Sequence, residues 1–464
     1  MSINKFVNPG FFLSVDLFLV SLINWIYWLV ISTLISPTEV GKATSVYSFV
    51  LLISAITMLG LEYSLVKKSS SLRSHILGTS IIMELILTAI SIPFLFYFIN
   101  NLYGGSLSSL AFIAIGILIF YSQRYIMRFA LLGNSDAISV LKINLIGVVL
   151  QLATGYILVY MGYGATGILI SFLLHFILVT ILSFLVARKS FELNLDLRYA
   201  KVLIKDALLN TPNSLSKTVI YTLSVVLLAS IGINQADVGR YYIALMVSII
   251  AGGFAGNIAF MVIPASTHSR KDLSSDSTRL GLSITAPLIV ALMVAPASIL
   301  SVIGPEYASA APVLLVLAIA IFPYVIVINA ISKFNNLGKS KKIVSLGTIQ
   351  LVAFLLTFFL LVPEYGTLGA AFSILTASVA SAIPSLIWSE SRLLRYVVKS
   401  CISIIAGLTF GYLAGFWLFS ISPALVILSS VTVTLLLVFM LKVTSTKEMS
   451  LMVSDIIGTK YRKT

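Results

Sequence analysis

Apolar stretches about 20 residues long recur along the whole chain, and no other feature constrains its fold as strongly. About 20 apolar residues in a helix cross the roughly 30 Å of hydrocarbon in a bilayer. The first stretch is too long for the apolar core of a signal peptide, so it is expected to be a retained helix. The sequence therefore predicts an all-α polytopic membrane protein with about 14 transmembrane helices. The expected spans are 11–35, 44–66, 76–99, 107–130, 143–161, 166–187, 212–232, 241–264, 280–303, 312–332, 343–362, 368–388, 398–419 and 424–441.

The charged residues agree with this interpretation. They make up 10% of the chain, and the mean hydropathy is +1.07, whereas a soluble domain carries about 25% charged residues. The formal net charge of +14 would suggest nucleic-acid binding in a soluble protein. In a membrane protein it raises instead the question of which side the cations face.

The Lys and Arg residues divide sharply between the two sides of these spans. With the N-terminus inside, 28 of the 30 lie in cytoplasmic segments, and only Lys42 and Arg240 lie outside. This is the asymmetry that the positive-inside rule describes. We expect a multi-pass protein of the cell membrane with both termini in the cytoplasm, and no nucleic-acid partner.

Cysteine and histidine are too sparse for a metal centre. Cys401 is the single cysteine, and His75, His175 and His268 lie far apart in the chain. A disulfide framework, a thiolate metal site and a histidine metal site are therefore not expected. No cofactor is expected either.

A weak internal repeat relates the two halves of the chain at an offset near 200. Each match is weak alone, because glycine marks turns everywhere, but four occur in order, each at the corresponding helix. The matching pairs are Glu39-Val40-Gly41-Lys42 with Asp237-Val238-Gly239-Arg240, Leu132-Gly133-Asn134-Ser135 with Leu337-Gly338-Lys339-Ser340, Tyr163-Gly164-Ala165-Thr166-Gly167 with Tyr365-Gly366-Thr367-Leu368-Gly369, and Pro9 with Pro212.

The repeat predicts two pseudo-symmetric six-helix bundles around a central cavity, followed by two C-terminal helices. Six spans is an even number, so the halves share one orientation, as in transporters that rock between two access states. The expected parts are an N-lobe at 1–187, a cytoplasmic linker at 188–211, a C-lobe at 212–388, two further helices at 389–441 and a cytoplasmic tail at 442–464.

Several repeated segments also resemble a known family. Gly-Pro-Glu-Tyr at 304–307, Tyr-Gly-x-x-Gly at 365–369 and the segments at 34–54, 60–68 and 131–171 look like those of oligosaccharide and polysaccharide flippases. These flippases belong to the multidrug/oligosaccharidyl-lipid/polysaccharide (MOP) superfamily. The resemblance covers about residues 1–400 and rests on loop patterns and helix order.

The resemblance implies a flippase that carries a polyprenyl-(pyro)phosphate-linked oligosaccharide from the cytoplasmic to the outer leaflet, for surface polysaccharide or glycoprotein glycan assembly. The expected partners are this glycan lipid, membrane lipids and a coupling ion, H⁺ or Na⁺. The alternative is a cation-coupled multidrug exporter of the same superfamily, although such exporters usually have twelve helices. A membrane glycosyltransferase or polymerase would need a large outer domain, whereas the expected outer loops are eight residues or shorter. We therefore expect no enzyme activity.

Charged residues inside spans are the first candidates for handling a phosphate, because each costs about 2.5–3.5 kcal/mol to insert. Arg124 and Arg128 share a face of the fourth span at i and i+4. They are candidate phosphate ligands, since arginine binds phosphate oxygens bidentately; the alternative is snorkelling to the inner headgroups. Lys217 in the seventh span is a third candidate.

Acidic and polar side chains complete the set of candidates. Asp16 is a candidate for gating or ion coupling and is expected to pair with Lys217 across the cytoplasmic mouth; the alternative is that the two are unrelated charges near the membrane interface. Glu84 is a candidate for ion coupling, or else a hydrogen-bond partner of a neighbouring helix. The candidate sugar-facing residues are Asn24, Trp28 and Gln123, and packing is the alternative for the aromatic one.

Overall fold

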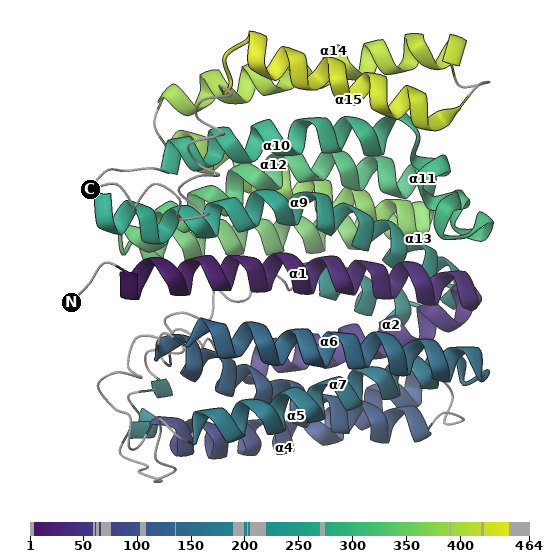
Figure 1. Cartoon of the computed structure of the whole chain (residues 1–464). Coiled ribbons are helices and arrows are strands. Elements are labelled where there is room, and N and C mark those ends of the chain that lie inside the picture. Colours follow the sequence, from purple (N-terminus) through teal and green to yellow (C-terminus); the bar gives the residue numbers. More distant parts are fainter. Residues whose placement is uncertain are drawn as a thin grey trace. The chain divides into compact units, whose positions relative to one another are not determined.

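The computed structural model describes most of the chain, and in this part every regular element is a helix (Figure 1). Helices bond their peptide groups internally, which a segment surrounded by lipid requires. The described residues are 4–58, 61, 65, 76–102, 108–134, 136–188, 199–201, 203–204, 220–269, 274–389, 391–418 and 422–444.

One compact unit spans Val15–Tyr242. Within it α6 packs on α7, α7 packs on α5, and α5 packs on α4, while α2 lies against α4, α5 and α7. These helices run nearly parallel to one another (Figure 1). Their bounds are α1 (Asn4–Leu34), α2 (Pro37–Thr57), α4 (Ile76–Leu102), α5 (Ser108–Gly133), α6 (Ala137–Tyr160) and α7 (Gly164–Ala187), and the first two turns of α9 (Gln235–Ser269) also belong to this unit.

The other compact unit comprises Met1–Ser14 and Ile243–Thr464. In it α12 packs on α10 and α13, and the α14–α15 pair packs on α10. After the remainder of α9 come α10 (Ser274–Val294), α11 (Pro296–Ile303), the 3₁₀-helix η1 (Pro305–Ala310), α12 (Ala311–Asn336), α13 (Ser340–Ile387), α14 (Ser391–Leu418) and α15 (Pro423–Met440). The boundaries predicted from sequence for the lobes, linker and tail stay a prediction.

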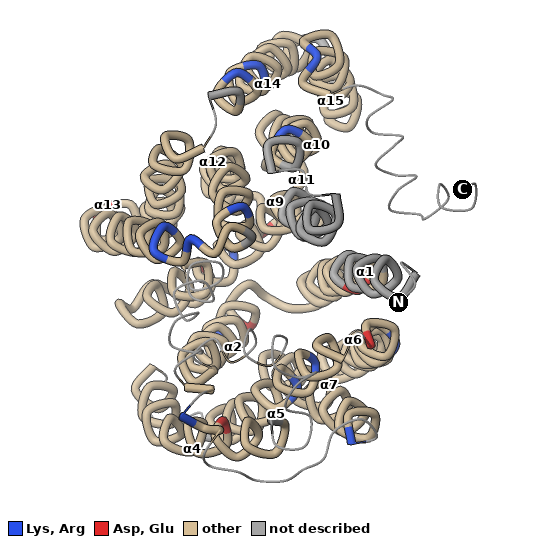
Figure 2. The backbone as a smooth tube through the Cα atoms, turned by 90° about the vertical axis from the view of Figure 1, so that its left-hand side faces the viewer, with Lys and Arg blue, Asp and Glu red and all other residues tan. Residues whose placement is uncertain are grey.

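Nine described helices are long and apolar enough to cross a membrane, and a bent pair adds a tenth. Charged positions are few along these helices (Figure 2). The expected span at 212–232 is described only from Ile220, where an apolar helix runs to Ser230. The α-helical, polytopic fold class is thus confirmed, while the exact number of fourteen spans stays a prediction.

At two places the helices differ from the separate straight helices that the sequence predicts. The expected span at 280–303 is broken, because Thr278–Val294 and Pro296–Ile303 meet at an angle of 83°. A proline at the first position of a helix fits this break, since its nitrogen has no hydrogen to donate. The expected spans 343–362 and 368–388 are both in α13, separated by Gly366 with φ +53° and ψ −129°. Glycine adopts this left-handed backbone without the clash that a Cβ would cause.

The repeat reappears as matching side-chain geometry. Lys42 forms an ion pair with Glu39 at 2.7 Å, and Arg240, 198 residues later, forms one with Asp237 at 2.8 Å. Gly164 and Gly366, 202 residues apart, both have positive φ, at +48° and +53°. At these positions the two halves therefore adopt equivalent local structures.

The equivalent helix starts of α2 and α9 also touch one another. A Cβ on Gly41 would overlap the carbonyl oxygen of Gln235, and a Cβ on Gly239 would overlap the carbonyl oxygen of Pro37. Residues 37 and 41 correspond to 235 and 239 at one offset, so the contact is reciprocal. Only glycine permits backbones to approach this closely.

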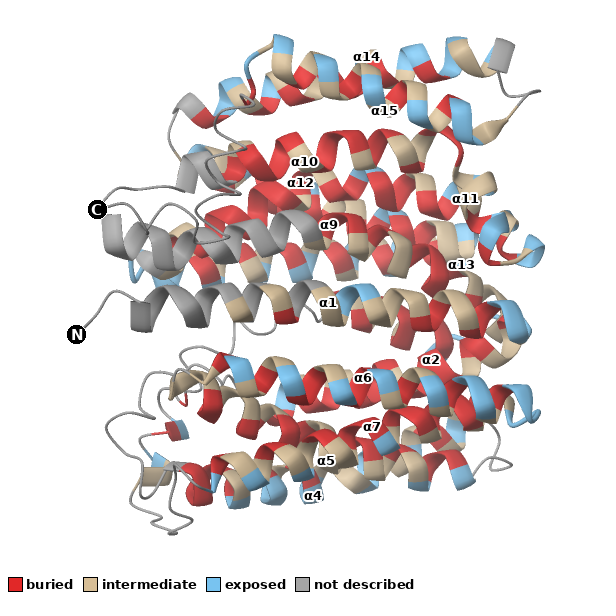
Figure 3. Cartoon of the chain, viewed as in Figure 1, coloured by how far each residue is buried: buried red, intermediate tan, exposed pale blue. Residues whose placement is uncertain are grey.

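Apolar residues exposed on the outer faces mark where lipid is expected. On α4, Ile86, Ile90, Phe94 and Tyr97 are more than half exposed, and exposed positions also follow α6, α14 and α15 (Figure 3). A water-soluble protein rarely exposes apolar patches of this extent. The fold therefore combines buried helix faces with lipid-facing ones.

Candidate functional site

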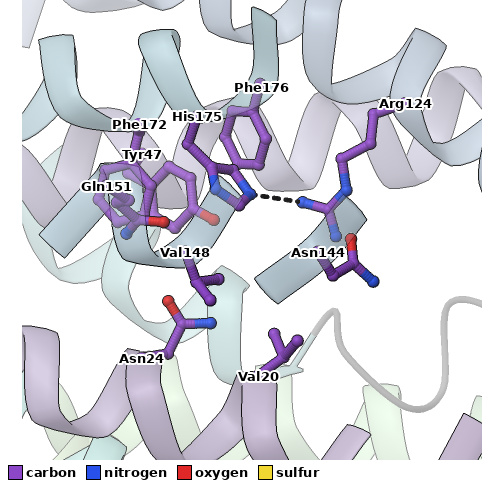
Figure 4. Close-up of a pocket in the computed structure, with 10 residues that line it drawn as sticks. All are labelled: Val20, Asn24, Tyr47, Arg124, Asn144, Val148, Gln151, Phe172, His175 and Phe176. Carbon is purple, nitrogen blue, oxygen red and sulfur yellow. Dashed lines mark hydrogen bonds between the residues drawn. The ribbon is translucent and has the colours of Figure 1, made fainter. Parts of the chain in front are cut away.

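A cavity lies within the Val15–Tyr242 unit, enclosed by α1, α2, α5, α6 and α7. Its volume is about 40 Å³ for the centres of water molecules, which suits a few waters but not a sugar. The lining residues are Val20, Asn24, Tyr47, Arg124, Asn144, Val148, Gln151, Phe172, His175 and Phe176 (Figure 4).

The spacing of residues along α6 and α7 gives the cavity two walls of different chemistry. Asn144, Val148 and Gln151 follow one face of α6 at i, i+4 and i+7, and two of the three carry a carboxamide. Phe172 and Phe176 lie one turn apart on α7, and Phe172 stacks on Tyr47 with ring centres 4.2 Å apart and 14° between the planes. The cavity thus has a carboxamide wall and an aromatic wall.

Arg124 supplies the positive charge of the cavity. Its guanidinium carbon lies 5.3 Å from the ring centre of Phe176 and 5.8 Å from that of Tyr121. The residue is only 9% exposed, and no carboxylate of the described residues forms an ion pair with it. Its Nε has no hydrogen-bond partner in this part of the chain. A buried cation without a counter-charge attracts an anionic ligand.

His175 holds the guanidinium from the side of α7. Arg124 Nη1 lies 3.4 Å from His175 Nε2, and because a guanidinium only donates, this nitrogen accepts and the ring proton is on Nδ1. A Cβ on Gly147 would lie 2.9 Å from that Nδ1 and would overlap Val179. The close approach of α6 and α7 at this glycine therefore fixes where the imidazole lies.

Arg128, one turn further along α5, has a counter-charge. Its Nη2 donates to Asp16 Oδ2 at 2.9 Å, and Asn144 Nδ2 donates to Asp16 Oδ1 at 2.8 Å. The side chain of Asp16 is 1% exposed. This network joins α1, α5 and α6, and it leaves Arg124 as the cation whose charge is not compensated by a described acidic residue.

The structure brings some of the predicted site residues together and separates others. Asp16 and Arg128, predicted for different roles, form one ion pair. Asn24 lines the same cavity as Arg124, whereas Trp28 packs against Tyr242 with ring centres 4.9 Å apart. The remaining candidate positions fall elsewhere.

Gln123 and Glu84 are not among the residues that line this cavity. Gln123 is buried, and its amide atoms have no partner among the described residues. Glu84 Oε1 accepts hydrogen bonds from Thr57 at 2.8 Å and from Thr88 at 3.2 Å, so it joins α4 to α2. Lys217, including its expected pairing with Asp16, lies outside the described residues.

Four polar lining residues were not predicted from the sequence: Tyr47, Asn144, Gln151 and His175. Asn144 and Gln151 carried a usable signal, because polar residues seven apart in an apolar span lie on one helix face. The sequence contains no such signal for Tyr47 and His175, since their place in the cavity depends on which helices pack together.

A family model described as polysaccharide biosynthesis protein matches residues 30–312. The chain belongs to this family. The matched region includes every helix that lines the cavity except the first part of α1. A search of curated proteins finds no match.

Solved structures share the fold of this polysaccharide biosynthesis family member. The lipid II flippase MurJ, in an inward closed conformation, aligns with a TM-score of 0.73 and 14% identity, covering 92% of this chain and 98% of that one. An inward-facing multidrug resistance MATE family transporter of the MOP superfamily aligns with a TM-score of 0.61 and 16% identity, covering 85% and 96%.

A MOP superfamily transporter from Pyrococcus furiosus, whose binding pocket has reversed polarity, aligns with a TM-score of 0.56 and 16% identity, covering 85% of this chain and 96% of that one. The resemblance to the MOP superfamily is confirmed. The chain thus belongs to the polysaccharide biosynthesis protein family and has the fold of MOP superfamily transporters.

Proposed function

We propose that this protein is a flippase that moves a polyprenyl-(pyro)phosphate-linked oligosaccharide from the cytoplasmic to the outer leaflet by alternating access, for surface polysaccharide or glycoprotein glycan assembly. The observation that supports this most directly is Arg124. It is a buried cation in a cavity, without a carboxylate partner among the described residues. The flippase MurJ, to which the fold is similar, is named for a lipid substrate.

The chemistry of the cavity suits a phosphate headgroup. A guanidinium binds phosphate oxygens through two parallel N–H donors. Arg124 Nε has no hydrogen-bond partner among the described residues and can serve as one of these donors, while Nη1 is directed at His175. Burial strengthens the attraction, because the low dielectric of the interior screens charges weakly. Asn24, Asn144 and Gln151 can donate to the hydroxyl groups of a glycan.

A cation-coupled multidrug exporter is the second candidate, because MATE transporters share the fold. The charge of the cavity argues against the cationic drugs that such an exporter would carry. Arg124 repels a cation, and Asp16, which accepts a hydrogen bond from the lining residue Asn144, also forms an ion pair with Arg128. Arg124 would not repel anionic or neutral drugs, so measuring drug sensitivity separates the two functions.

The proposal includes an orientation and a coupling ion. The distribution of 28 of 30 Lys and Arg residues predicts that both termini face the cytoplasm of a cell with this protein in its plasma membrane. Glu84, buried and bonded to Thr57 and Thr88, and Asp16 are the candidates for H⁺ or Na⁺ coupling.

Deleting the gene tests the proposal, with surface glycan and carrier-linked oligosaccharides measured together. We expect surface glycan to disappear and the lipid-linked intermediate to accumulate. The rescue variants are Arg124→Met, which should fail, and Arg124→Lys, which should restore part of the surface glycan because the charge remains. Lys341→Met, at an exposed position outside the cavity, is the matched control and should rescue fully.

Normal surface glycan without accumulated intermediate in the deletion strain contradicts the flippase assignment. Raised drug sensitivity in that strain would favour the exporter instead.

A further inference from the structure

The end of the cavity away from Arg124 has uncharged polar groups. Figure 4 shows Arg124 and Asn144 on one side, Gln151, Tyr47 and Phe172 on the other, and His175 between them. Asn24 on α1 faces the same space. The cavity therefore has two chemically different ends.

Gln151 is the informative residue at the uncharged end. It is 2% exposed, and its Nε2 has no hydrogen-bond partner among the described residues. An unsatisfied buried donor destabilises the folded state, and native proteins rarely leave one without a reason. This donor lines a cavity, so an acceptor on a ligand can reach it.

The spacing along the helices places this donor one sugar away from the phosphate site. α5 ends at Gly133 and α6 begins at Ala137, so decreasing residue numbers in α5 and increasing numbers in α6 both lead away from that end. Arg128 and Asn144 are at one level, because both bond Asp16. At 1.5 Å per residue, Arg124 lies about 6 Å and Gln151 about 10 Å beyond that level. The difference, about 4 Å, is one that a phosphate and the sugar ring it carries can span.

We propose that Gln151, with Asn24, binds the sugar that is joined directly to the lipid phosphate, and that this sugar is a neutral hexose or N-acetylated hexose. This inference rests on the proposed function. The Gln151 amide donates to a hydroxyl or acetamido oxygen, and the rigid Tyr47–Phe172 stack offers an apolar face to the sugar C–H groups. An acidic sugar is disfavoured, because Arg124, the one uncompensated cation among the described lining residues, is taken by the phosphate.

The cavity must widen before a sugar enters it, since its present volume suits only water. Asn24 and Val20 on α1 form one wall, and Gln151 on α6 forms another. The sugar therefore binds when these walls are further apart than in the present form, with the two carboxamides approaching it from opposite sides.

The test measures binding of two lipids to the full chain in detergent: a polyprenyl methyl phosphate and a polyprenyl phosphoryl-glucose. Both are phosphodiesters with one negative charge, so they differ only in the sugar. We expect the wild type to bind the glucosyl lipid about tenfold more tightly, the value of roughly one good hydrogen bond. Gln151→Met should lose most of this preference and keep its affinity for the methyl diester. Gln350→Met, which changes another buried glutamine outside this cavity, should keep the preference.

The outcomes separate the inference from the proposed function. If Gln151→Met retains the tenfold preference, the sugar sub-site is wrong. If the wild type and Arg124→Met bind the methyl diester equally, the phosphate site, and with it the proposed function, is wrong. Gln151→Met should unfold at or above the wild-type temperature, since it removes an unsatisfied donor. Should it fail to fold, Asn24→Leu tests the same sub-site from the opposite wall, and retention of the preference there likewise overturns it.

Discussion

Arg124 and Arg128 lie one helical turn apart, and we predict that replacing them has opposite effects on stability. Arg128 and Asp16 are separated by 2.9 Å, and at an effective dielectric constant of about 20 this corresponds to an attraction of roughly 6 kcal/mol. Desolvation offsets part of it, and removing one partner of a buried pair typically costs about 3–5 kcal/mol. Arg128→Met should therefore lower the free energy of unfolding by about 3–5 kcal/mol, because it leaves the buried Asp16 carboxylate with Asn144 alone.

Arg124→Met should cost little or even stabilise the fold, because it removes a buried cation that has no described acidic partner. The double variant Asp16→Asn with Arg128→Met should recover most of the loss, because both charges are then gone. Reversible denaturant unfolding of the purified chain in detergent measures all four free energies. Equal destabilisation by Arg124→Met and Arg128→Met, or a double variant no better than Arg128→Met, would refute the reasoning.

Three further predictions concern other contacts. Gly41→Ala should lower the unfolding temperature or part the helices at that crossing, because its Cβ overlaps a backbone oxygen of α9. Gly253→Ala, with open space around it inside α9, should not lower the unfolding temperature, since alanine favours a helix over glycine. Tyr27→Phe should lower the free energy of unfolding by about 1 kcal/mol, because it deletes a buried 2.8 Å hydrogen bond to Ser171; denaturant titration checks this. Glu84→Gln should fold normally and yet lose the dependence of vesicle transport on a proton or sodium gradient, and an unaltered dependence would exclude this residue from coupling.

Apolar length and the distribution of cations were enough to predict the helical class and most span positions. The length of each apolar stretch has to match the thickness of the bilayer, so each span can be recognised without knowing which helices surround it. The break between Val294 and Pro296 was not predicted. A proline inside an apolar stretch can be absorbed by a helix, as Pro323 is in α12, and only the surrounding packing decides which occurs.

The candidate site was predicted in part, for a physical reason. Depth in a span identifies Arg124, Arg128 and Asp16 as costly to bury, but depth does not say which charges meet. Asp16 forms its ion pair with Arg128 and not with Arg124 because of how the faces of α1, α5 and α6 point toward one another. Sequence also gave no reason to select His175, whose contact with Arg124 requires α7 to approach α6 at Gly147.

The reciprocal glycine contact between the starts of α2 and α9 has a mechanical consequence. No side chain of Gly41 or Gly239 interlocks across it, so the contact consists of closely packed backbone atoms, with a 3.3 Å hydrogen bond from Ser45 Oγ to Gln235 Oε1 beside it. The dispersion attraction between the backbones loses about a quarter to a half of its strength over roughly 0.5–1 Å of extra separation, while each helix keeps its own peptide hydrogen bonds when the two part. The joint therefore has no stable half-open position. We expect these helix ends to be found either fully engaged or fully separated, which gives the crossing the character of a latch with two settings.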